Sequence, residues 1–229
     1  MKIIVANWKM NGGFAFADRF IKEMNAVVSP QTIVVCPPAI LIGRFSGFKH
    51  SLGAQNCFWE ERGAFTGENS PKLLREAGCD YVILGHSERR SIFGEDNGMI
   101  YRKWMAALAH GLIPIVCVGE KFDNRYECEE VISDQLALFL DGPKLLANTI
   151  FAYEPVWSVG TGITPTPDEI VEIFAFLKEK VGDAALLLYG GSVNAKNAKD
   201  ILNCEYVDGV LVGGASLKID EFKKIVDAV

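Results

Sequence analysis

Short apolar stretches alternate with longer amphipathic ones along the whole chain. Eight apolar stretches have the length of strands and show no polar–apolar alternation, which is typical of parallel strands covered on both faces. They are Ile3–Ala6, Ile33–Cys36, Ser51–Ala54, Tyr81–Leu84, Ile113–Val118, Thr149–Tyr153, Leu186–Tyr189 and Gly209–Val212. Between them apolar residues recur every three or four positions, as in Phe16, Phe20, Met24 and Val27, which predicts helices.

The number of these units predicts the fold class. Eight strand–helix units in 229 residues average about 29 residues each, which matches a repeated βα motif. Such a chain closes most simply into an α/β fold, a single (β/α)₈ barrel over residues 1–229. A doubly wound open sheet is the alternative, but its usual GxGxxG after the first strand is replaced by Asn-Trp-Lys-Met-Asn-Gly-Gly at residues 7–13.

Composition narrows the classes of partner. The formal net charge of −6 argues against nucleic acid or an anionic membrane as a partner, although it leaves room for a local phosphate site. No apolar run approaches the roughly 20 residues of a membrane helix, and the first run is too short for a signal peptide. The six cysteines show no CxxC and no histidine spacing, so we expect reduced thiols, no metal site and a cytoplasmic protein.

Polar residues directly follow several strands, and in a barrel these positions meet at one rim. Glu154 follows the sixth strand, before Pro155 and an apolar segment that ends at Gly160-Thr161-Gly162. A carboxylate on a strand end beside a hinged apolar segment suits proton abstraction under a closing loop. Alone, the same glutamate could simply end a strand beside an ordinary loop.

His86 follows the fourth strand, and Asn7 and Lys9 follow the first. A lone histidine there is more often structural, and a lone lysine is usually a solvated charge. His86 opens His-Ser-Glu-Arg-Arg, which reads as a first helical turn whose dipole would keep the imidazole neutral. A neutral imidazole donates a hydrogen bond to a carbonyl oxygen, and Lys9 on the same rim is a candidate cation for substrate oxygens.

Two glycine turns, Gly190-Gly191-Ser192 and Gly213-Gly214, follow the last two strands. Without bulky side chains, their backbone N–H groups can approach an anion closely, and each turn precedes a helix. One Gly-Gly pair is usually just a tight turn. Two of them after the seventh and eighth strands predict a phosphate site.

These motifs resemble those of the triosephosphate isomerase family. The matching segments are residues 7–12 (Asn-Trp-Lys-Met-Asn-Gly), 64–68 (Ala-Phe-Thr-Gly-Glu), 85–90 (Gly-His-Ser-Glu-Arg-Arg), 116–120 (Val-Cys-Val-Gly-Glu), 153–157 (Tyr-Glu-Pro-Val-Trp), 160–162, 189–192 and 211–217. The resemblance implies a TIM barrel isomerase that interconverts dihydroxyacetone phosphate and glyceraldehyde 3-phosphate through an enediolate. It also implies a place in glycolysis and gluconeogenesis, and no metal or organic cofactor.

The resemblance further implies a role for each matching residue. Glu154 would be the catalytic base, His86 and Lys9 would stabilise the enediolate, and Asn7 and Lys9 would contact the substrate. Glu88 would support Lys9, and Leu211 would pack beside the base. Backbone amides would hold the phosphate at Gly160, Ser192, Gly213 and Gly214.

The resemblance implies a homodimer built around the loop at residues 55–68. In relatives the residue that matches Thr66 reaches toward the neighbouring active site, and the one that matches Arg89 helps to fix the contact. Phe58, Trp59 and Phe65 in this loop fit an interface. They could instead fold back onto their own barrel.

The chain departs from the family pattern at three places. Val159 stands where isoleucine is usual, and Ile163 where many relatives have lysine. The segment 162–186 is shorter than usual, which predicts a trimmed helix. Two other functions stay open: an isomerase of larger phosphorylated sugars, and a non-catalytic barrel kept as a binding protein. The first does not account for Asn7, Lys9, His86 and Glu154 together. The second would be signalled by loss of the base or the electrophile, and both are present.

Overall fold

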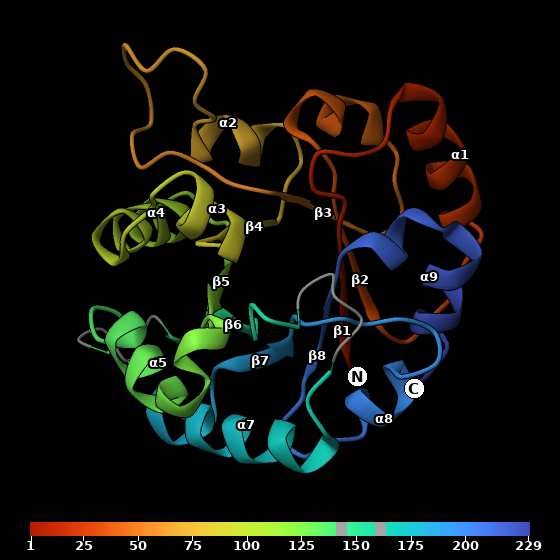
Figure 1. Cartoon of the computed structure of the whole chain (residues 1–229). Coiled ribbons are helices and arrows are strands. Elements are labelled where there is room, and N and C mark those ends of the chain that lie inside the picture. Colours follow the sequence, from red (N-terminus) through yellow and green to blue (C-terminus); the bar gives the residue numbers. More distant parts are fainter. Residues whose placement is uncertain (141–145, 159–163) are drawn as a thin grey trace.

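The computed structural model describes residues 1–140, 146–158 and 164–229 as a closed barrel of parallel strands (Figure 1). Each strand pairs with the next along the chain, and the last pairs with the first. The strands are β1 (Ile3–Asn7), β2 (Thr32–Cys36), β3 (Ser51–Ala54), β4 (Tyr81–Leu84), β5 (Ile113–Val118), β6 (Ile150–Tyr153), β7 (Leu186–Tyr189) and β8 (Gly209–Val212). The predicted (β/α)₈ barrel is therefore confirmed, and the open sheet is excluded.

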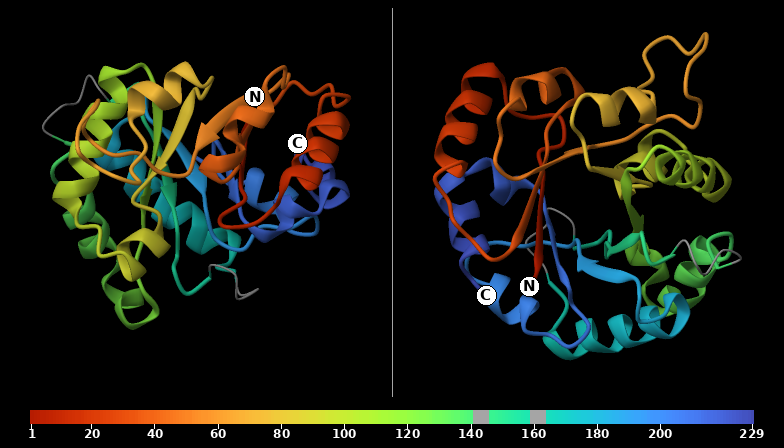
Figure 2. Two further views of the ribbon diagram at one scale, coloured as in Figure 1. Left: turned by 90° about the horizontal axis from the view of Figure 1, so that it is seen from above. Right: turned by 180° about the vertical axis from the view of Figure 1, so that it is seen from behind.

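Helices surround the barrel, as the views in Figure 2 show. Over the described residues they are α1 (Phe14–Met24), η1 (Ala39–Phe45), α2 (Pro71–Glu76), α3 (Ser87–Ile92), α4 (Asn97–Ala109), η2 (Phe122–Glu127), α5 (Cys128–Leu136), α7 (Pro167–Val181), α8 (Ala198–Leu202), η3 (Gly214–Leu217) and α9 (Ile219–Val226). None of them is long and apolar enough to cross a membrane.

The helix α7 begins where local sequence dictates. Thr166 caps it, Glu169 completes a reciprocal capping box, and Pro167 occupies the first helical position. This helix is 15 residues long and fills most of the segment that we expected to contain a trimmed helix. Residues 182–185 connect it to β7.

Strand side chains divide between two buried layers. Ile3 and Val5 of β1 belong to a cluster formed by strand residues, which fills the barrel, whereas Ile4 and Ala6 join the larger cluster beneath the helices. Successive side chains of a strand point to opposite faces, so both faces of each strand are buried. This explains why the strands read as continuous apolar runs in the sequence.

The strand register brings the C-terminal strand ends close together around Glu154. The Glu154 N–H donates to the carbonyl of Val118, and the Gly190 N–H donates to the carbonyl of Tyr153, each over 2.8 Å. A Cβ at Gly119 would lie 1.9 Å from the Glu154 carbonyl oxygen, and a Cβ at Gly190 would lie 2.9 Å from Glu154 Cγ. Both positions therefore require glycine beside this residue.

The loop at residues 55–68 projects from the barrel before α2 (Figure 1). Phe58 stacks on Trp59 with ring centroids 4.0 Å apart and lies 4.6 Å from Phe65. The Arg102 guanidinium of α4 covers the Trp59 ring at 4.0 Å. The aromatic side chains thus pack on one another and on α4, while Phe65 stays 42% exposed. The aromatic side chains of this loop therefore fold back onto their own chain only in part, through the contact between Trp59 and Arg102 of α4.

Candidate functional site

A cavity of about 270 Å³ lies at the C-terminal ends of the strands and collects most of the predicted site residues. It is lined by residues of β1 and β8, by residues that follow β1, β4 and β6, and by the turns after β7 and β8. The predicted residues among its lining are Asn7, Lys9, His86, Glu154, Ser192, Leu211, Gly213 and Gly214. Gly160 lies outside the described residues, as do Val159 and Ile163.

Glu154 is buried, and both of its carboxylate oxygens are occupied. Oε1 lies 2.9 Å from Nε2 of His86, and Oε2 accepts a hydrogen bond of 2.8 Å from the Ser87 N–H. Burial raises the pKa of Glu154, but the facing His86 and the Ser87 N–H lower it more, so the net pKa lies below its ordinary value. In this pose Glu154 is a stable carboxylate and a weakened base.

His86 caps the N-terminus of α3, as the sequence predicts. Its Nδ1 accepts a hydrogen bond of 3.2 Å from the Glu88 N–H, so Nδ1 carries a lone pair and the proton of the neutral ring is assigned to Nε2. This tautomer directs the only ring N–H toward Glu154.

The pKa of His86 shifts in the direction opposite to the one expected from the helix dipole. Burial lowers the pKa of His86, but the Glu154 carboxylate raises it more, so the net pKa lies above its ordinary value. Without the Glu154 carboxylate the largest cause of the increase would be absent, and burial and the Glu88 N–H would favour the neutral ring.

Lys9 is held in an unusual backbone conformation beside the cavity. Its φ of +52° lies in the left-handed region, and such residues are retained where the surroundings enforce them, often at functional sites. The Lys9 N–H donates to Asn7 Oδ1 over 3.0 Å, and the Lys9 carbonyl accepts from Gln55 Nε2 over 2.8 Å. The ammonium lies 2.7 Å from Glu88 Oε1, so the two residues lie together as predicted.

The two glycine turns border the cavity on the side of β7 and β8. A Cβ at Gly213 would lie 3.5 Å from Lys9 Cε, and one at Gly214 would meet open space. The side chain of Lys9 and the turn after β8 therefore face the same cavity. Ser192 is tied to Ser158, because its Oγ donates to the Ser158 carbonyl over 2.5 Å. An anion bound here would meet backbone N–H groups and the two lysines of the lining, Lys9 and Lys218, the second of which pairs with Glu221.

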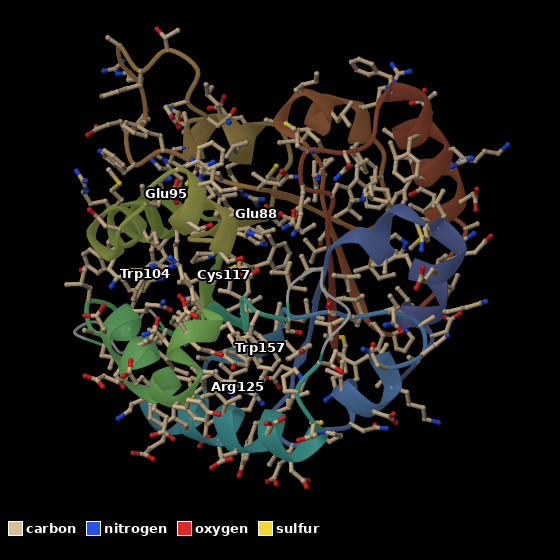
Figure 3. The ribbon with its side chains drawn as sticks, viewed as in Figure 1. Glu88, Glu95, Trp104, Cys117, Arg125 and Trp157 are labelled. Atoms are coloured by element: carbon tan, nitrogen blue, oxygen red, sulfur yellow. The ribbon has the colours of Figure 1, made fainter. Side chains whose placement is uncertain are left out.

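The segment that leaves Glu154 is anchored by Trp157. Its indole Nε1 donates to Glu120 Oε1 over 2.8 Å, and the Tyr153 hydroxyl donates to the same oxygen over 3.2 Å. Burial raises the pKa of Glu120, although these donors partly offset the increase. The Arg125 guanidinium covers the Trp157 ring at 4.5 Å, and the two lie side by side in Figure 3.

A larger cavity of about 680 Å³ lies on the other side of Glu154, between α3, α4, η2 and α5. Its lining contains five carboxylates and only two cations; the carboxylates are Asp96, Glu127, Glu130, Asp134 and Glu154, and the cations are Arg90 and Lys121. Such a lining repels a phosphate. The phosphate that the glycine turns predict therefore fits the smaller cavity better, where two lysines and both glycine turns surround Glu154.

Two functional contacts escape sequence reasoning. The Ser87 N–H that binds Glu154 belongs to the first residue of α3, and such N–H groups lack a partner within their helix, which is the only signal the sequence contains. The side chain of Arg90 donates to the carbonyls of Gly85 and Cys117, and no spacing in the sequence predicts these bonds.

The predicted interface residues lie outside the 270 Å³ cavity. Thr66 is exposed on the projecting loop. Arg89 pairs with the buried carboxylate of Glu95 and lines a separate cleft of about 340 Å³, together with Gly67 and Phe93. This cleft also touches Lys9, so the two sites are neighbours.

Comparison with known proteins gives a consistent result. A family model described as triosephosphate isomerase matches residues 2–229. The chain is 43% identical to triosephosphate isomerase of Aquifex aeolicus over 98% of each chain. It is 42% identical to that of Herpetosiphon aurantiacus over 98% of this chain and 97% of the relative, and 42% identical to that of Dictyoglomus turgidum over 98% of each.

Proposed function

Because the chain belongs to the triosephosphate isomerase family and interconverts dihydroxyacetone phosphate and glyceraldehyde 3-phosphate, we propose that Glu154 is the base of this reaction. The observation that carries the assignment is the contact between its carboxylate and the imidazole of His86 at the cavity wall. The family assignment also sets aside an isomerase of larger sugars and a non-catalytic barrel.

The contacts of Glu154 define what the base must do. Glu154 leaves the Ser87 N–H and His86 Nε2, which removes the two contacts that lower its pKa. The carboxylate then sits in a buried environment that raises its basicity. It takes a proton from the hydroxyl-bearing carbon next to the substrate carbonyl, and the carbon–hydrogen electron pair forms the carbon–carbon double bond of the enediolate while the carbonyl electron pair moves onto its oxygen. Glu154 then returns the proton to the former carbonyl carbon, and the hydroxyl proton passes from its original oxygen, which becomes the new carbonyl, to the former carbonyl oxygen.

His86 and Lys9 stabilise the developing negative charge on the substrate oxygens. The departure of Glu154 frees the Nε2–H of His86, and a substrate oxygen replaces the carboxylate as its acceptor. The ammonium of Lys9 lies beside the same volume and is oriented by Glu88. The side chain of Asn7 accepts a hydrogen bond from the Lys9 N–H and lines the cavity.

The phosphate group is held by backbone N–H groups of the turns after β7 and β8, at Ser192, Gly213 and Gly214. Support comes from the cavity they share with Lys9. Gly160 completes this set by sequence match, although it lies outside the described residues. Leu211 of β8, which is 3% exposed, lines the cavity and limits access of water to the base.

The proposal includes a homodimer through the loop at residues 55–68. Exposed apolar side chains surround the cleft beside Lys9, among them Met10 and Phe93, which are 94% and 64% exposed. Such side chains gain from burial against a second copy. Thr66 of one copy would enter the cleft that Arg89 lines in the other. We also propose one domain over residues 1–229 and a cytoplasmic location, in keeping with glycolysis and six unpaired cysteines.

The roles of the base and the electrophile are tested by Glu154→Asp and His86→Gln in an isomerisation assay run in both directions. The aspartate keeps the carboxylate but shortens its reach, so kcat should fall while substrate affinity stays close to that of the wild type. The glutamine keeps a donor but loses the imidazole, so kcat should fall through loss of enediolate stabilisation. Wild-type kcat in either variant contradicts the corresponding role.

A further inference from the structure

The guanidinium group of Arg90, in α3, donates hydrogen bonds to three acceptors. Its Nε donates to the carbonyl of Gly85 over 2.9 Å, and its Nη1 donates to Oδ1 of Asn97 over 2.7 Å. Its Nη2 donates to the carbonyl of Cys117 over 3.2 Å. These acceptors belong to the residue after β4, the first residue of α4 and the strand β5.

The bond to Gly85 acts directly on His86. The Gly85 carbonyl and the His86 N–H belong to one peptide plane, so a donor that fixes the oxygen also fixes the orientation of the His86 backbone. Gly85 has a φ of +65°, and a Cβ there would lie 2.7 Å from the side chain of Ile100. The chain therefore makes a sharp, constrained turn between β4 and His86, and Arg90 holds its carbonyl.

The bond to Cys117 connects this turn to the strand that aligns the base. Cys117 pairs with Ala152 in the β5–β6 register, and the Glu154 N–H donates to the carbonyl of Val118. In barrel order β5 lies between β4, which leads to His86, and β6, which leads to Glu154. Cys117 occupies a central position in Figure 3.

We propose that Arg90 is a positioning residue that ties the β4 turn to β5 and so sets the placement of His86 relative to Glu154. The inference rests on the roles proposed above for these two residues. Arginine suits the task because its planar guanidinium presents several N–H donors in a fixed fork, whereas lysine offers one compact ammonium on a flexible stem. Arg90 acts through the backbone and does not touch the substrate.

The first test compares Arg90→Met and Arg90→Lys with the wild type. A displacement of about 1 Å in a catalytic group can lower the rate roughly a hundredfold, so kcat should fall by about tenfold to a hundredfold in the methionine variant. The value of KM should change by less than about threefold, because the turns after β7 and β8 keep their structure. The lysine variant keeps the charge without the fork and should lose nearly as much.

The matched control is Arg44→Met. Arg44 also makes a pair of hydrogen bonds, to Asp18, but its side chain is 51% exposed and lies outside the site. Its kcat should equal that of the wild type. Thermal unfolding of all variants separates a loss of kcat from a loss of folded protein.

A second test uses the cavity of about 680 Å³, whose wall includes Arg90. In Arg90→Ala this cavity gives added guanidinium a route to the vacated donor position. Millimolar guanidinium chloride should restore kcat several-fold in this variant and leave the wild type and Arg44→Met unchanged. Urea has a similar planar shape but no charge and presents an oxygen in place of one donor, so it should not rescue.

Wild-type kcat in folded Arg90→Met would overturn the proposal. A loss of kcat that guanidinium does not relieve, or relieves no better than urea, would also overturn it, because that pattern is expected of a purely structural residue. If Arg90→Met does not fold, Arg90→Lys takes its place with the same criterion. Failure of the base assignment is distinguishable, since it would appear as retained activity in Glu154→Gln with Arg90 intact.

Discussion

Replacement of Glu154 by glutamine separates the loss of a base from the loss of resting contacts. The Ser87 N–H can only donate, so the amide oxygen must face it and the amide NH₂ must face His86 Nε2. His86 would then need its proton on Nδ1, where the Glu88 N–H already donates. One of these hydrogen bonds must fail in the variant.

The size of the effect on stability follows from this conflict. A buried donor left without an acceptor costs about 1–3 kcal/mol, and removal of the buried charge offsets part of it. In a chain of this length each kcal/mol lowers the Tm by roughly 2–4 °C. We therefore expect a small decrease in Tm together with a loss of kcat of about a hundredfold to ten-thousandfold, because no acceptor remains for the substrate proton.

The measurements are a coupled isomerisation assay, thermal unfolding and the affinity of a phosphorylated substrate analogue. Analogue binding should stay within about tenfold of the wild type, or 1.4 kcal/mol, because the phosphate contacts are unchanged. The control Glu23→Gln removes a carboxylate that pairs with Lys223 at the surface and should keep full activity. Near wild-type kcat in Glu154→Gln would refute the base assignment, and an unchanged Tm would refute the hydrogen-bond argument.

Three further predictions concern the interface, the cavity wall and the histidine. Thr66→Glu with Phe65→Asp should give monomers of reduced activity in sedimentation at micromolar concentration, because the contact would bury uncompensated carboxylates; unchanged dimers would place the interface elsewhere. Leu211→Ala removes a buried side chain, so it should cost about 2–5 kcal/mol in unfolding experiments and weaken an enediolate-mimicking inhibitor; unaltered inhibition would contradict its place beside the base. NMR titration should show a lower pKa for His86 in Glu154→Gln than in the wild type, since the carboxylate is the main cause of the increase. This contact stabilises the wild type below the ordinary pKa of 6.5 and loses its effect as the pH rises through the higher folded pKa, so equal titration curves and equal pH dependence of stability would contradict it.

The barrel could be predicted from the sequence because its strands are buried on both faces and leave continuous apolar runs. Five strands have the predicted bounds, and β1, β2 and β6 differ from them by one residue. The positions after the strands could also be predicted, since parallel strands end at one rim. This is why Lys9, His86 and Glu154 are found around one cavity.

The details that sequence could not reveal depend on three-dimensional contacts between distant segments. The pKa of His86 is raised by Glu154, which lies 68 positions later in the chain, whereas the local argument considered only the helix that His86 begins. The bonds of Arg90 likewise join α3 to β5 and α4, and nothing in the motif distinguishes this arginine from Arg89. Residue types in the sequence predict which side chains lie close together, but not the atoms through which they form hydrogen bonds.

The pairing of β1 with β8 has a consequence during protein synthesis. Lys9 leaves the ribosome long before Gly213, which lies beside it in the closed barrel, where a Cβ at Gly213 would lie 3.5 Å from Lys9 Cε. A nascent chain that stops before β8 lacks the turn at Gly213 and has two unpaired strand edges, on β1 and β7. Such edges invite association with other chains, so translation products that stop before β8 should be inactive, aggregation-prone and dependent on chaperones.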